Sequence, residues 1–182
     1  MIRVAVILLV MLAILTALII GVVFVVRKVI ENKNSSETGD ISLSLHAAEL
    51  IPSYVVLDSE NVYAAYFTAP SAFSGIEVYG ATVGDSPSVK VTIYSFDTDY
   101  FTSVSSSNRK FSISFSDYPD KSWLFASFKS LPAGNYIVVV SSSSTGGAYY
   151  SSMPAENSAS VFFKNGEPWS GGALYCNILL NR

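Results

Sequence analysis

Two pairs of acidic residues are the first groups in this sequence whose spacing could support chemistry. Asp97 and Asp99 form one pair, and Asp117 and Asp120 form the other. Two carboxyl groups can hydrolyse a glycosidic bond, and carboxylate oxygens can bind Ca²⁺. Both pairs lie between apolar-alternating runs, where Asp commonly stabilises turns. We therefore expect all four residues to serve turns, with a Ca²⁺ site near Asp97 and Asp99 as the alternative.

The chain has one histidine, His46, and one cysteine, Cys176. A serine nucleophile needs a base within hydrogen-bond reach, and the sequence contains no Gly-x-Ser-x-Gly motif. One cysteine can form neither an internal disulfide nor a zinc site built from several cysteines. We expect a surface or capping role for His46 and a small buried apolar residue in Cys176. The sequence predicts no enzyme activity, no metal and no cofactor.

Aromatic residues in predicted loops are the remaining candidates for ligand binding. Sugar rings have apolar C–H faces that can stack on tryptophan and tyrosine, and loops at the ends of a rigid scaffold often carry binding residues. The alternative is that these rings fold back onto the edge of the core. Trp123 lies within a predicted strand instead, and we expect it in the core. The predicted ligand-binding residues are Trp169, Tyr149, Tyr150, Tyr100 and Tyr118.

Short apolar-alternating runs, separated by turn residues, must position these side chains. Lys110–Ser116 alternates phenylalanine and isoleucine with serine, and Tyr136–Val140 is continuously apolar, as in a central strand. This period-2 pattern predicts an all-β fold, an antiparallel β-sandwich. After Ile30 only Leu45–Leu50 could form a helical turn. The predicted strands are 41–45, 54–57, 62–68, 73–83, 88–96, 110–116, 121–129, 136–140, 160–164 and 173–180.

The strongest local motif is the sequence LPAGNY at 131–136. It predicts a tight turn, because proline fixes φ and glycine tolerates positive φ. This Leu-x-x-Gly-x-Tyr pattern resembles a turn in secreted β-sandwich and jelly-roll modules, among them carbohydrate-binding-like domains of bacterial glycoside hydrolases. Similar segments are 67–70 leading to 76–78, 89–94, and 163–169. The resemblance covers about residues 60–182 and implies a jelly-roll-like sandwich with a glycan ligand.

The N-terminus is a long apolar run. From Val4 to Val26 no residue is charged, and Thr16 is the only polar side chain. At about 1.5 Å rise per residue, such a helix spans the roughly 30 Å hydrocarbon core of a bilayer. The run is longer than the apolar part of a cleavable signal and lacks a small-x-small cleavage site. We therefore predict an uncleaved transmembrane signal anchor, with the lipid bilayer as its partner.

One face of this predicted helix carries small residues four positions apart. Ala13, Ala17 and Gly21 would let a second membrane helix approach closely. They predict self-association or contact with a membrane-protein partner. The alternative is that alanine and glycine are simply common in membrane helices.

The chain divides into a transmembrane helix at 1–31, a polar linker at 32–40 and a β-sandwich domain at 41–182. From Ser35 onward, seven Lys and Arg stand against thirteen Asp and Glu, a net charge of about −6. The domain thus lacks the clustered basic residues that nucleic acids require. Arg27, Lys28 and Lys33 favour a cytoplasmic domain by the positive-inside rule, whereas its serine- and tyrosine-rich strands favour export. We expect an extracytoplasmic domain.

These features together predict a membrane-anchored, non-catalytic recognition module at the cell surface that binds a glycan or cell-envelope polymer. The alternative is a structural or accessory subunit of a membrane complex, or of a pilin-like filament packed through its N-terminal helices.

Overall fold

A computed structural model of the chain describes residues 42–47, 53–151 and 160–181. Residues from Asp40 to Arg182 form one compact unit. The predicted anchor helix and linker, with Ala13, Ala17 and Gly21, lie outside the described residues. None of the helices in the described ranges is long and apolar enough to cross a membrane.

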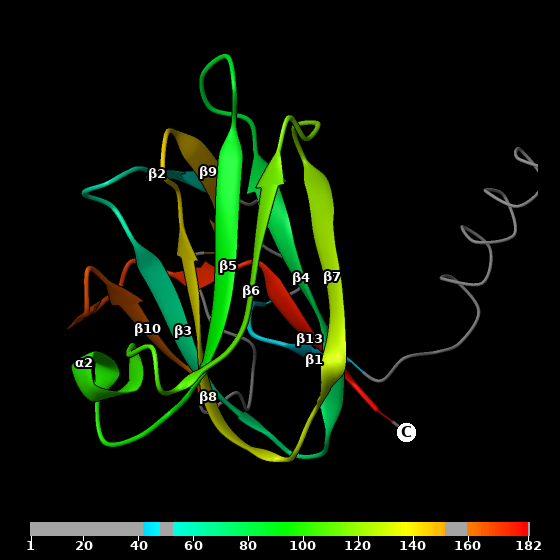
Figure 1. Ribbon diagram of the computed structural model, residues 1–182. Coiled ribbons are helices and arrows are strands. Elements are labelled where there is room, and N and C mark those ends of the chain that lie inside the picture. The colour runs from blue at the N-terminus through cyan, green and yellow to red at the C-terminus, as the bar shows by residue number, and fades with distance from the viewer. Residues whose placement is uncertain (1–41, 48–52, 152–159, 182) are drawn as a thin grey trace, which may run out of the picture. The chain divides into compact units, whose positions relative to one another are not determined.

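The described part of the chain consists mainly of two antiparallel sheets (Figure 1). In the seven-stranded sheet, β4 is the central strand, because it pairs with β13, β7 and β9. Beyond them, β1 pairs with β13, and β2 and β12 pair with β9. The strands of this sheet are β1 (Ser42–Ser44), β2 (Ser53–Leu57), β4 (Phe73–Ala81), β7 (Ser122–Leu131), β9 (Gly146–Ser151), β12 (Ala173–Leu174) and β13 (Cys176–Leu180).

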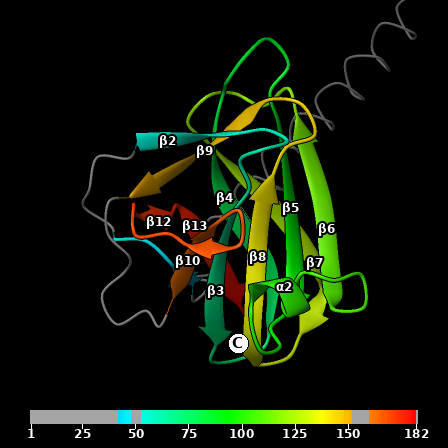
Figure 2. The same ribbon diagram turned by 90° about the vertical axis from the view of Figure 1, so that its left-hand side faces the viewer.

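The six-stranded sheet has the order β11-β10-β3-β8-β5-β6. Its central strand β8 contains the predicted apolar run, and the residues of that run are buried on both faces. Figure 2 shows the short helix α2 (Tyr100–Ser103) against the outer side of β8 and β5. The strands are β3 (Tyr63–Ala69), β5 (Ser88–Ser95), β6 (Arg109–Ser116), β8 (Gly134–Ser141), β10 (Val161–Lys164) and β11 (Glu167–Pro168).

The core fills the space between the two sheets. Its largest rings are packed edge to face: Phe73 contacts Phe67 at 5.8 Å and Tyr136 at 5.0 Å between ring centroids. The Tyr136 hydroxyl donates to the carbonyl of Pro132 at 2.9 Å, which ties the turn at 131–136 to the strand that follows it. Burial raises the pKa of Tyr136.

The prediction of an all-β sandwich is confirmed at the level of two packed antiparallel sheets. Three elements were not expected, among them the two-residue strand β11 in a predicted loop. Strand β9 begins at Gly146, in a stretch whose serines and glycines indicate a flexible loop. Helix α2 forms because Asp99 and Thr102 make a capping box, in which each side chain accepts the other residue's backbone N–H.

Candidate functional site

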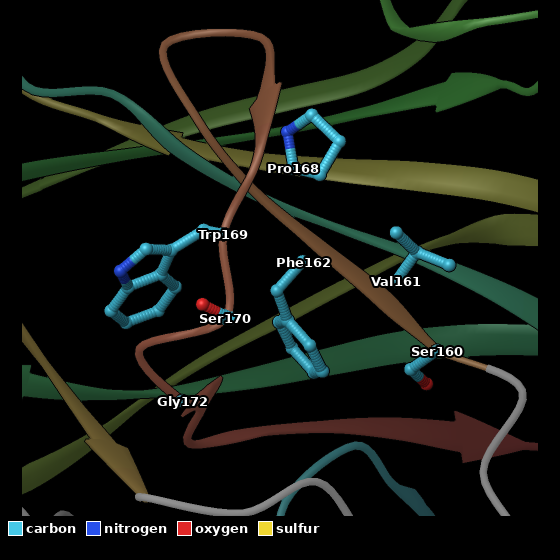
Figure 3. Close-up of a pocket in the computed structure, with 7 residues that line it drawn as sticks. All are labelled: Ser160, Val161, Phe162, Pro168, Trp169, Ser170 and Gly172. Atoms are coloured by element: carbon cyan, nitrogen blue, oxygen red, sulfur yellow. The ribbon is translucent and has the colours of Figure 1, made fainter.

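Trp169 is the predicted binding residue that lies next to a cavity. It follows β11, is half-buried, and packs edge-on against Tyr63 and Tyr150, with ring centroids 5.0 and 5.3 Å away. Its backbone N–H donates to the carbonyl of Phe162 at 2.7 Å. A pocket of about 320 Å³ opens beside it, lined by Ser160, Val161, Phe162, Pro168, Trp169, Ser170 and Gly172 (Figure 3).

This pocket offers little to hold a polar ligand. Its lining has no charged side chain, and its only side-chain hydroxyls belong to Ser160 and Ser170. In Figure 3 the indole of Trp169 is drawn on the opposite side of the loop from Phe162 and Val161. The indole is also held between two tyrosine rings, so most of its surface is committed to the edge of the core.

Tyr118 and Tyr149 are buried, which agrees with the alternative that such rings fold back onto the core. Tyr118 retains 8% of its surface, and its hydroxyl donates to the Ala81 carbonyl at 3.0 Å. Tyr149 retains 6%, because it belongs to β9 and not to a loop. Its hydroxyl donates to Asp120 at 3.3 Å. Burial raises the pKa of both phenols.

Tyr150 and Tyr100 do not join these residues in one site. Tyr150 is partly buried against the core, beside Trp169. Tyr100 lies on α2 and packs against Phe163 at 5.4 Å, on the outer face of the six-stranded sheet. Of the five predicted ligand-binding residues, the structure therefore brings only Trp169 and Tyr150 into contact.

One residue of each acidic pair holds a loop or helix end through its side chain. Asp99 caps α2 by accepting the Thr102 N–H at 2.8 Å, and this bond lowers its pKa. Asp120 accepts the Thr82 N–H at 3.0 Å, which lowers its pKa in the same way. Within the described ranges, no three His, Cys, Asp or Glu side chains are grouped as metal ligands.

The lone cysteine and histidine are both buried. Cys176 is in the core, as predicted, and burial raises the pKa of its thiol. His46 is also buried, so a surface position for it is wrong. Its ring stacks on Tyr175, with the two centroids 3.8 Å apart. This contact places His46 on the outer face of the seven-stranded sheet.

That outer face carries a line of four aromatic rings, two on strands and two on residues that adjoin strands. Tyr79 on β4 pairs in register with Trp123 on β7, and their ring centroids are 4.9 Å apart. Tyr175, between β12 and β13, is 6.0 Å from Tyr79, and His46 follows β1. We call His46, Tyr175, Tyr79 and Trp123 the aromatic row.

A second line of side chains runs beside the aromatic row, two residues further along each strand. Asn177 pairs in register with Ser44 on one side and with Glu77 on the other. Ser44 donates to Asn177 Oδ1 at 2.8 Å, and Asn177 Nδ2 donates to Glu77 Oε2 at 3.3 Å. These contacts orient the Glu77 carboxylate. We call Ser44, Asn177 and Glu77 the polar row; Phe125 on β7 continues it.

The two rows meet solvent at the β7 side of the sheet. Trp123 is 41% exposed and Phe125 is 52% exposed, although both are large and apolar. From Tyr79 the rings also continue to Tyr149 at 5.1 Å and on to Tyr54 at 6.1 Å, and Tyr54 is 55% exposed. Isolated exposed apolar residues are ordinary, whereas a contiguous group of them marks an interaction site.

The position of Trp123 corrects the sequence-based expectation that it belongs to the core. In β7, Leu124 and Ala126 take the core-facing positions, so Trp123 and Phe125 must point outward. The sequence contained a signal for this outward position, because the residues on both faces of this strand are apolar.

Comparison with known proteins found no protein-family model, no curated protein and no solved structure that matches this chain.

Proposed function

We propose that this chain is a membrane-anchored, non-catalytic recognition module that binds a glycan through the outer face of its seven-stranded sheet. The observation that carries the proposal is the solvent-accessible end of the aromatic row, Tyr79 and Trp123, with the polar row directly beside it. The resemblance of several segments to carbohydrate-binding-like jelly-roll modules points in the same direction.

The two kinds of surface on a sugar ring match an aromatic row that lies beside a polar row. A pyranose ring presents an apolar C–H face and a rim of hydroxyl groups, so it needs a stacking partner and hydrogen-bond partners at once. Tyr79 and Trp123 supply ring faces. Glu77 and Asn177 supply carboxylate and amide groups two residues along the strands, which is about 7 Å away, within the span of one sugar unit and its substituents.

The site is built on strands, and this favours a preorganised surface. Cross-strand pairing fixes the spacing of Tyr79 and Trp123, and the Ser44–Asn177–Glu77 hydrogen bonds restrict the carboxylate. Binding groups on rigid elements lose less conformational entropy than groups on loops. The predicted N-terminal anchor would keep such a surface close to the membrane, where cell-envelope polymers are found.

The charge of the domain limits the class of ligand. Its net charge of about −6 and the carboxylate of Glu77 in the polar row disfavour an acidic polymer. We therefore propose a neutral glycan over an anionic one.

Retention of the full-length chain on immobilised neutral and acidic polysaccharides, in detergent, tests this proposal. We expect Trp123→Ala to weaken binding to a neutral polysaccharide about tenfold, since about 60 Å² of buried apolar contact contributes about 1.5 kcal/mol. Phe101→Ala is the matched control, because Phe101 is 66% exposed on α2, away from both rows. Equal loss in the two variants, or no retention of the wild-type chain on any polysaccharide, would contradict the proposal.

A further inference from the structure

Strand β7 ends the seven-stranded sheet on one side. Among the described strands it pairs only with β4, so the other edge of its ten residues carries backbone N–H and C=O groups without a strand partner. Figure 1 shows β7 as the outermost strand on the right. A long free edge is a template for pairing with another chain.

The edge strands β11, β1 and β6 have features that discourage pairing. The remaining edges are the two-residue β12 and β2, an uncharged strand half as long as β7. Strand β11 has two residues, one of them Pro168, and β1 has three. Strand β6 begins with Arg109 and Lys110, and its outward side chains are serines. Short edges, proline and charge are the usual protections of a sheet edge.

Strand β7 has none of these protections over its first six residues. Ser122–Ser127 contains no charge, proline or glycine, and it exposes Trp123 and Phe125. A β-bulge interrupts the register with β4 after Ser127, and bulges commonly end a pairing segment. The regular, uncharged part of the edge is therefore Ser122–Ser127.

We infer that β7 is a self-pairing edge, through which two copies of this chain join antiparallel and form one continuous sheet. Two identical strands related by a two-fold axis must place residues of the same face opposite each other. Centring the axis on Leu124 places Trp123 of each copy opposite Phe125 of the other. This register places no like charges opposite each other, because Ser122–Ser127 contains no charged residue.

This register accounts for the two exposed apolar side chains at the edge. Each Trp123–Phe125 contact across the axis is an aromatic cross-strand pair, a type of contact that stabilises sheets. The dimer would contain two such pairs, and both rings would lose part of their solvent contact. The aromatic rows of the two copies would then lie on one shared face. The inference rests on β7 alone and holds whether or not the face binds a glycan.

Disulfide trapping between two variants of the full-length chain, each with one added cysteine, tests the inference and its register. A Trp123→Cys copy mixed with a Phe125→Cys copy places one cysteine opposite the other, while the second Trp123–Phe125 pair remains intact. Opposed Cβ atoms lie about 4.5–5.5 Å apart, close to the separation that a disulfide requires. Under a mild oxidant in detergent, we expect severalfold more covalent dimer in the mixture than in either variant alone. The native Cys176 is buried and does not compete.

The β6 edge provides the matched control. Ser112→Cys mixed with Ser114→Cys places exposed cysteines at the same spacing on the other long edge strand, and we expect no enrichment of covalent dimer there. Equal cross-linking on both edges, or no enrichment in the Trp123→Cys and Phe125→Cys mixture, would overturn the inference.

A second measurement does not depend on cysteine chemistry. The double variant Trp123→Lys and Phe125→Lys places lysines opposite each other twice in the proposed register, and like charges across a strand pair repel. We expect its mass in detergent to be that of one copy, whereas the wild type and Ser112→Lys with Ser114→Lys remain paired. A wild type that has the mass of a single copy would equally overturn the inference.

Discussion

At the residue scale, the contact between Asp120 and Tyr149 links the turn before β7 to strand β9. The Asp120 carboxylate accepts hydrogen bonds from the Thr82 N–H and the Tyr149 hydroxyl, at 3.0 and 3.3 Å. Both bonds favour the charged carboxylate and hold the pKa of Asp120 below its usual 3.8. One side chain therefore joins three segments that are distant in the sequence.

This contact makes a pH-dependent contribution to stability. A folded-state pKa below the unfolded value gives stability that is complete above pH 3.8 and lost as the pH falls through the folded value. We expect Asp120→Asn to lower the free energy of unfolding near neutral pH and to have little effect in acid, where the wild-type carboxyl is also uncharged. Urea unfolding of the full-length chain at both pH values, followed by circular dichroism, measures this difference.

Asp85→Asn, in the turn before β5, is the control for that experiment, since Asp85 is an exposed aspartate in another turn. An equal loss of stability for Asp120→Asn in acid and at neutral pH would show that the carboxylate's charge contributes nothing.

Single residues were also where prediction from the sequence was weakest. Trp123 was expected in the core and Tyr149 in a loop, whereas Trp123 is 41% exposed and Tyr149 is a buried residue of strand β9. Exposure depends on which face of a strand meets the other sheet. Local residue types do not determine that face when the residues on both faces of a strand are apolar, as in β7.

At the element scale, most strands could be predicted because their residues alternate in a two-residue period. Lys110–Ser116 corresponds to β6, and Tyr136–Val140 lies within β8. The turn between β7 and β8 could be predicted from Pro132 and Gly134, and Gly134 has a φ of +153°. The local sequence alone was sufficient to predict these strands and this turn.

Other elements depend on contacts that the sequence does not reveal. Strand β9 gains its order from pairing with β2, β4 and β12, not from its own glycine-rich start. Helix α2 is a single turn that depends on one capping box and on packing of Tyr100 against Phe163. The two rows on the proposed binding face were equally hidden, since they combine residues from in and beside β1, β4, β7 and β13.

At the scale of the whole molecule, the proposal joins a binding face to a predicted membrane anchor. We expect the full-length chain to stay with the membrane fraction after an alkaline wash, because the apolar run from Val4 to Val26 is long enough, as a helix, to span the hydrocarbon core. A variant that lacks residues 1–31 is expected in the supernatant. Release of the full-length chain by the same wash would contradict the tethering and also the alternative of a helix-packed filament.

A substitution on the small-residue face of the predicted helix distinguishes assembly through that helix from pairing through β7. Gly21→Leu would block close approach of two membrane helices and leave the β7 edge unchanged. Loss of assembly in Gly21→Leu alone would favour the structural or filament role.

The most direct test of the binding face uses the two tryptophans of the chain as reporters. Trp169→Phe leaves only Trp123, on the sheet face, and Trp123→Phe leaves only Trp169, at the pocket. On titration with a neutral polysaccharide, we predict that Trp123 fluorescence shifts and becomes protected from iodide quenching, while Trp169 fluorescence does not change. A response from Trp169 alone, or from neither residue, would contradict the account.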